Sequence, residues 1–376
     1  MSHSTSVTSR DDKTAAERSG KVIVLPGQTP DGEYILSVLV KRSYRLVPGQ
    51  HCVRAEADLK LFPAEVFYDD PMNSAVKYES DFIPYKVATD VVFNAWAYAP
   101  DGRPVQALTA SVAVAGKGKD ILVIGDRACC YREDAPPVFT EPEPFTRMEI
   151  RYERAYGGTD IWSDPKVPCA YARNHLGRGF VIGSSRKVID KLPLPNLEDP
   201  KQPLTPERLA TGHFIAWERQ PLPQSFGWVS KIWRPRSLLA GVLPADRRVE
   251  QEMRRVYAAA LPPEQREVYA SNPLPDMDFR FFNGAQPELT FPFLTGEEEM
   301  RTVNLSPEGE LNFQLPGERP GIGLEIGSGI QEPPVVLHTV MVRMEERQVD
   351  LVWRGAVSYP GPDWLSQMRK MEVLIQ

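Results

Sequence analysis

The densest group of polar and aromatic side chains lies in residues 151–160, with the sequence RYERAYGGTD. Alternation along an extended chain predicts that Tyr152, Arg154 and Tyr156 share one strand face, with Glu153 on the other. Arginine and tyrosine often anchor protein interfaces, so this run could form a recognition surface. Alternatively, Glu153 and Arg154 pair with partners that hold nearby loops in place, and we favour this structural interpretation.

A second run, residues 174–180 (NHLGRGF), has the composition of a loop. Its asparagine can replace backbone partners in a turn, and its glycines permit backbone conformations that other residues avoid. If the protein has a binding surface, we expect it in these two runs. The candidate binding residues are Tyr152, Glu153, Arg154, Tyr156, Gly157, Gly158, Asn174, Gly177, Arg178 and Gly179.

A catalytic centre has less support, and we expect no catalytic residues. Glu153 and Asp199 could face each other across a cleft as acid and base, with His175 as a further candidate. A hydrolase acting on a polar, carbohydrate-like substrate therefore stays an alternative. Residues 183–185 (GSS) lack the second glycine of a serine nucleophile elbow.

Metal and phosphate sites also lack local support, and we expect no cofactor. The five histidines stand singly, at none of the spacings typical of zinc ligands. Residues 116–119 (GKGK) resemble a phosphate-binding loop, but such a loop leads from a strand into a helix. Strands are predicted on both sides here, which indicates the tip of a hairpin.

The composition of the whole chain limits which partners and which cellular compartment are expected. The 376 residues carry a net charge of −6, which argues against nucleic-acid or anionic-membrane partners. No apolar run approaches the length of about 20 residues that spans a membrane. The four cysteines form no CxxC pair, which favours a reducing compartment. Residues 1–20 are rich in Ser, Thr and charge and predict a disordered tail, not a signal peptide, so we expect a cytoplasmic protein.

Period-two alternation predicts a mainly β fold of antiparallel, sandwich-like sheets with long Pro- and Gly-rich loops and a few short helices. Strands are predicted at 34–40, 53–61, 87–99, 105–114, 121–124, 335–344 and 349–354, with a three-stranded meander over 87–124 and a hairpin over 335–354. A helix is predicted after Asp246, with Val249, Met253, Val256 and Tyr257 in one stripe, and shorter helices at 262–268 and 363–365.

The same pattern predicts one large mainly β domain over residues 21–376. Its β blocks lie at about 34–125 and 335–355, and a loop-rich, irregular lobe lies at about 136–334. The chain has 36 prolines, which are excluded from helix interiors and central strands and so indicate many stiff connections. We expect the two β blocks to pair across the lobe.

Several runs together resemble a bacterial family with a domain of unknown function, found beside genes for type VI secretion spike tips (PAAR-like proteins) and toxic effectors. The resemblance covers about residues 22–359, although His175 stands where the family would have a proline. The runs that carry it are 77–81 (KYESD), 97–102 (AYAPDG), 152–158 (YERAYGG), 174–180 (NHLGRGF), 194–200 (LPNLEDP), 233–236 (WRPR), 281–283 (FFN) and 351–355 (LVWRG).

This resemblance implies a cytoplasmic adaptor or chaperone that binds an effector or a PAAR-like spike tip and holds it ready for loading. The family brings no established catalytic residues. A structural component of the secretion apparatus is a further alternative.

Overall fold

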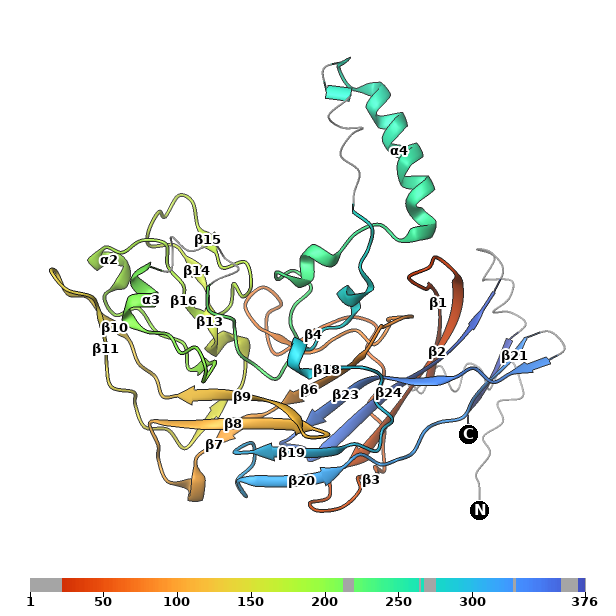
Figure 1. The fold of residues 1–376 in the computed structure, drawn as a ribbon, viewed down its shortest axis with the longest axis horizontal. Coiled ribbons are helices and arrows are strands. Elements are labelled where there is room, and N and C mark those ends of the chain that lie inside the picture. The colour runs from red at the N-terminus through yellow and green to blue at the C-terminus, as the bar shows by residue number, and fades with distance from the viewer. Residues whose placement is uncertain are drawn as a thin grey trace.

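The computed structural model describes residues 22–211, 220–263, 265–266, 275–326, 329–359 and 371–375. The predicted tail and the predicted helix at 363–365 lie outside these residues, as do residues 264, 267 and 268 of the predicted helix at 262–268. Within the described chain the fold is mainly β, with mostly antiparallel sheets and few helices, as predicted (Figure 1).

The largest sheet has seven strands. In spatial order these are β1 (Val22–Gln28), β2 (Tyr34–Arg45), β24 (Gln348–Ser358), β23 (Val335–Arg343), β6 (Thr89–Asn94) and β18 (Thr290–Phe291), with β3 (Val53–Arg54) paired to the end of β2.

Strands far apart in the sequence meet in this sheet. Strand β2 pairs with β24 over eleven residues, from Ile35↔Ser358 to Arg45↔Gln348. Strand β23 pairs with β24 as the predicted hairpin and, on its other side, runs parallel to β6. The predicted pairing of the two β blocks is therefore present.

A five-stranded sheet packs against one face of the large sheet, as a sandwich. Its order is β17 (Leu197–Glu198), β9 (Lys117–Ile124), β8 (Ala107–Val114), β19 (Glu299–Val303) and β20 (Glu310–Gln314). Alternating side chains of both sheets form one buried apolar core, in which Val112 and Phe313 join Val340, Leu351 and Trp353. This interior excludes water from both inner faces and supplies most of the driving force for folding.

Two smaller apolar clusters lie outside this core. A three-stranded sheet covers Leu36 and Val38 of β2, and a separate cluster around Tyr171 and Leu194 holds the loop-rich lobe together. The three-stranded sheet consists of β22 (Gly329–Gln331), β21 (Ile322–Ile326) and β25 (Met371–Ile375).

The remaining strands form short pairs, and the helices are short except for one. The pairs are β4 (Val66–Phe67) with β5 (Val76–Tyr78), β7 (Trp96–Tyr98) with β12 (Arg147–Glu149), β10 (Cys129–Cys130) with β11 (Val138–Phe139), β13 (Tyr156–Gly157) with β16 (Arg178–Gly179), and β14 (Thr159–Asp160) with β15 (Cys169–Ala170). Among the described residues the α-helices are α2 (Arg186–Ile189), α3 (Pro206–Thr211) and α4 (Arg247–Ala260). The 3-10 turns are η1 (Pro100–Gly102), η2 (Tyr152–Arg154), η5 (Arg236–Leu239), η6 (Pro244–Asp246), η7 (Phe279–Phe282) and η8 (Pro287–Leu289).

The predicted meander is only partly correct. Strands β8 and β9 form its hairpin around Ala115 and Gly116, whose positive φ angles of 48° and 77° suit a tight two-residue turn. This geometry confirms the hairpin interpretation of the GKGK run. The first meander strand, β6, instead lies in the other sheet between β23 and β18, because nearly all of its residues are buried on both faces.

The strand predicted at 53–61 is wrong beyond Arg54. The Asp58 side chain accepts from Ser43 N at 2.8 Å, and the Ser43 hydroxyl accepts from Leu59 N at 2.8 Å. The hydrogen bonds of these side chains take the place of the backbone hydrogen bonds that a longer strand would form with β2. The chain therefore turns away from β2 after Arg54.

Helix α4 confirms the helix predicted after Asp246. This helix projects away from the sheets (Figure 1). We call the described residues between 240 and 278 the arm.

Candidate functional site

The structure brings the two predicted binding runs together. Strand β13 pairs in parallel with β16, so that Tyr156 lies beside Arg178 and Gly157 beside Gly179. Gly157 has a φ of 150°, and a Cβ there would lie 2.1 Å from the carbonyl oxygen of Asn174. Only glycine fits such a close approach of two backbones.

The predicted strand through Tyr152, Arg154 and Tyr156 is wrong. Tyr152–Arg154 forms a 3-10 turn, η2, and the strand begins only at Tyr156. The buried Asn174 amide donates to the carbonyl oxygens of Tyr152 at 2.8 Å and Tyr156 at 3.2 Å, which fixes this turn against the second run. Hydrogen bonds from the Asn174 side chain thus take the place of backbone hydrogen bonds between strands.

The charged residues of the two runs pair locally. Glu153 accepts from the backbone N–H of Ala75 at 2.8 Å. Arg154 and Arg178 both approach the Asp126 carboxylate, at 3.6 and 3.5 Å, and all three side chains are partly exposed. These contacts match the structural interpretation, in which the charges hold neighbouring loops.

Most of the ten candidate residues are covered. Glu153, Arg154, Gly177 and Arg178 are half-buried, and the others are buried, namely Tyr152, Tyr156, Gly157, Gly158, Asn174 and Gly179. A partner could therefore reach only the half-buried members of this cluster directly.

The three residues of the hydrolase alternative do not meet in the cavity that Asp199 lines. Asp199 lines a cavity of about 220 Å³ beside Tyr156, Glu198 and Arg208, whereas neither Glu153 nor His175 does. Within that cavity, Glu198 pairs with Arg127 at 2.5 Å, and burial raises the pKa of Glu198 although Arg127 opposes the change.

His175 is held on both ring nitrogens. Its Nδ1 accepts from the Trp233 indole at 2.9 Å, and its Nε2 lies 3.1 Å from the carbonyl oxygen of Met72. The first contact makes Nδ1 an acceptor, so Nε2 carries the proton and donates to Met72. Such a histidine positions the loop around residue 72 and leaves no ring nitrogen for proton transfer.

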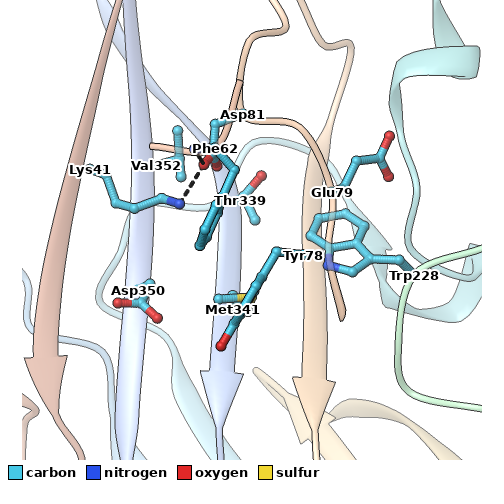
Figure 2. A pocket seen from close by; sticks show the side chains of 10 residues that line it. All are labelled: Lys41, Phe62, Tyr78, Glu79, Asp81, Trp228, Thr339, Met341, Asp350 and Val352. Carbon is cyan, nitrogen blue, oxygen red and sulfur yellow. Dashed lines mark hydrogen bonds and ion pairs between the residues drawn. The ribbon is translucent and has the colours of Figure 1, made fainter. Parts of the chain in front are cut away.

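The second face of the seven-stranded sheet carries a layer of buried charges. Lys41 pairs with Asp81 at 2.5 Å, as Figure 2 shows, and Lys86 pairs with Asp90 at 2.6 Å. Asp350 accepts from Arg343 Nε at 2.7 Å and from the Ser43 hydroxyl. Each carboxylate in this layer thus has a cationic partner.

A cavity beside Lys41 and Asp81 measures only about 10 Å³. This volume suits about one water molecule and excludes an organic substrate. Burial raises the pKa of Asp81, although Lys41 and the Phe62 N–H oppose the change. The layer therefore fixes the segment 58–86 on the sheet and is not a substrate site.

A buried ion pair attaches the base of the arm to the β body. Arg236 in η5 donates to the Glu79 carboxylate through two nitrogens, at 2.9 and 2.5 Å. Its other hydrogen bonds go to the carbonyl oxygens of Val229, before the arm, and Phe281, after it. One guanidinium thus joins the chain before and after the arm to Glu79.

A row of exposed apolar side chains lies on the arm. Helix α4 leaves Val249, Met253, Val256 and Tyr257 between 51% and 60% exposed, and among its residues only Ala258 is buried. We call these four side chains the α4 stripe. Their spacing of four, three and one residues places them on one helix face. The hydrophobic pattern in the sequence predicted the stripe, but such a pattern does not show what covers it.

The described residues contain no helix that is both long and apolar enough to cross a membrane. In the same part of the chain, no three His, Cys, Asp or Glu side chains are grouped so that they could hold a metal ion.

Comparison with known proteins places the chain in one family. No curated protein and no solved structure matches it. One family model, DUF2169, matches residues 31–354, and its description is an uncharacterized protein conserved in bacteria. The chain therefore belongs to this bacterial family, DUF2169.

Proposed function

We propose that this protein is a cytoplasmic adaptor or chaperone for type VI secretion, without catalytic activity of its own. It binds an effector or a PAAR-like spike tip and holds it for loading. The observation that carries the proposal is the exposed α4 stripe on the arm.

Physical chemistry supports a binding role for this stripe. A surface helix of a single-chain protein normally turns its apolar face toward the core. Burying one such side chain contributes about 1.5–3 kcal/mol relative to leaving it in water. Because α4 leaves just over half of each of these four side chains exposed, a partner that covered the stripe would gain part of this contribution from each side chain.

The link to type VI secretion rests on the runs that resemble the adaptor family. Two of the quoted runs lie next to the base of the arm in the fold. Arg236 of the WRPR run and Glu79 of the KYESD run form the ion pair at that base. Some of the runs that carry the resemblance therefore lie at the base of the arm whose helix bears the stripe.

The test is co-purification with the PAAR-like or effector protein encoded by the neighbouring gene. We expect a stoichiometric complex, and loss of delivery of that effector when the adaptor gene is deleted. Secretion that persists in the deletion strain, together with no complex in vitro, would contradict the proposal.

Fractionation separates this proposal from the structural alternative. An adaptor stays in the cytoplasm when the apparatus fires, whereas a component of the apparatus is found in the culture medium. A purified protein that hydrolyses a glycan, and loses this activity in Asp199→Asn, would instead favour the hydrolase.

A further inference from the structure

We infer that the partner receives α4 in an apolar groove whose rim carries carboxylates. This inference rests on the proposed function and names the chemistry of the partner surface. Three features of the arm lead to it, namely the spacing of the stripe, the arginines beside it and the fixed base of the arm.

The stripe has the geometry of a helix that inserts into a groove. Val249, Met253, Val256 and Tyr257 occupy positions i, i+4, i+7 and i+8 of a 14-residue helix. Amphipathic helices that bind in grooves present their anchors at these spacings. A flat polar surface would leave the outer members of such a stripe in water.

Arginines flank the stripe on both sides. The triplet Arg-Arg-Val occurs twice, at residues 247–249 and 254–256, seven residues apart. At about 100° per residue, this repeat places Arg248 and Arg255 along one flank and Arg247 and Arg254 along the other.

The arginines of the two flanks differ in their ion-pair partners and in their exposure. Arg247 and Arg254 both pair with Glu250 of the same helix. Arg248 is exposed, and the Arg255 side chain is 79% exposed and pairs with Glu252, itself 60% exposed, at 2.8 Å. The flank of Arg248 and Arg255 is therefore the one that a partner can reach.

The net charge of α4 indicates an acidic partner. Four arginines against two glutamates give the helix a charge of +2, in a chain whose net charge is −6. A second copy of this chain would bring two helices of charge +2 together, which is unfavourable. Carboxylates along the rim of a groove would complement both the charge and the planar geometry of the guanidinium groups.

The base of the arm is fixed before any partner binds. Val242 bridges to Asp276 across the base, with hydrogen bonds from Val242 N to Pro275 O at 2.9 Å and from Met277 N to Val242 O at 3.0 Å. Arg247 also pairs with Asp276, which ties the first turn of α4 to the returning chain. Less orientational freedom is then lost on binding.

The test measures the affinity of the full chain for the purified PAAR-like or effector protein of the neighbouring gene, at low and high salt. Val249→Gln/Val256→Gln makes two of the four stripe positions polar, and Arg248→Glu/Arg255→Glu reverses the accessible flank. The matched controls are Met72→Gln/Val167→Gln and Arg103→Glu/Lys117→Glu, which make the same kinds of change at exposed sites outside the arm. Circular dichroism and thermal unfolding check that all variants fold.

We expect each arm variant to weaken binding at least about tenfold, and the controls to change it less than about twofold. We also expect wild-type binding to weaken as salt rises, and the Arg248→Glu/Arg255→Glu variant to lose most of that dependence. Together these results would support an apolar groove with an acidic rim.

Other outcomes overturn the inference in distinguishable ways. If the wild type binds and both arm variants bind equally well, the groove is refuted while the adaptor function stands. If only the stripe variant is impaired, the acidic rim is refuted. If the protein alone is a dimer in sedimentation and Val249→Gln/Val256→Gln makes it a monomer, the stripe binds a second copy. If the wild type does not bind at all, the proposed function and this inference fail together.

Discussion

Replacing Glu79 by Gln should strongly destabilise the protein, because it leaves a buried arginine without its counter-charge. The side chains of Arg236 and Glu79 are only 5% and 2% exposed, so solvent screens their interaction little. In the variant, Arg236 keeps its bonds to the carbonyl oxygens of Val229 and Phe281 but meets an amide N–H₂ where a carboxylate oxygen was. Breaking such a pair from one side costs about 3–5 kcal/mol.

The dependence on pH supplies a second check on the same variant. Burial alone would raise the pKa of Glu79, but Arg236 and, less strongly, Lys231 outweigh it and hold the pKa below its ordinary value of 4.5. The ion pair therefore contributes its full stability above pH 4.5 and loses it as the pH falls through the folded-state pKa. The difference in stability between wild type and variant should shrink in acid.

The assay is urea unfolding followed by tryptophan fluorescence, at pH 7 and at about pH 3. The control is Glu310→Gln, which breaks an exposed pair with Arg301 and should leave the unfolding midpoint unchanged. The double variant Glu79→Met/Arg236→Met should recover part of the loss, because neither side chain then carries a buried charge. A loss below about 1 kcal/mol at pH 7, or one that persists undiminished in acid, would refute the reasoning.

Three further predictions concern other parts of the fold. Gly157→Ala should cost at least about 1–3 kcal/mol for backbone strain alone, and more because its Cβ would clash with Asn174 O; Gly49→Ala, which shares a positive φ but has open space around it, should cost clearly less in the same urea unfolding. His338 is fully buried, and burial followed by Arg354 and Lys86 lowers its pKa well below 6.5. Below pH 6.5 the unfolded chain takes up a proton that the folded protein excludes. The stability of wild type relative to His338→Gln should therefore decrease by up to about 1.4 kcal/mol for each pH unit below 6.5, and parallel pH profiles would contradict this. Burial raises the pKa of the Cys52 thiol to about 12 and that of Cys129 to about 11, so mass spectrometry of the native protein treated with iodoacetamide should find modification only at Cys130 and Cys169.

The elements that could be predicted are those whose signal is local. The hairpin of β23 and β24 and the helix α4 follow from periodicity within each segment, and both are present. The position of β6 could not be predicted in this way. A strand whose residues are buried on both faces has no alternation to show which sheet it joins.

The candidate binding runs show a similar limit. Their residues do lie together, but Asn174 takes over the hydrogen bonds of the turn at Tyr152, which no alternation pattern can indicate. The hairpin of β19 and β20, which completes the five-stranded sheet, was missed because it lies in a stretch dominated by Pro and Gly signals. The ion pair of Glu79 with Arg236 joins residues 157 positions apart, and nothing in the sequence fixes such a distance.

The pairing of β2 with β24 has a consequence for biosynthesis. Residues near position 40 find their neighbours near position 353, so the ribosome must add more than 300 further residues before the central ladder can close. Contacts this remote along the chain slow folding, and an emerging chain with an unpaired β2 exposes a sheet edge prone to aggregation. Truncation before Val335 removes β23 and β24 and should therefore yield insoluble material.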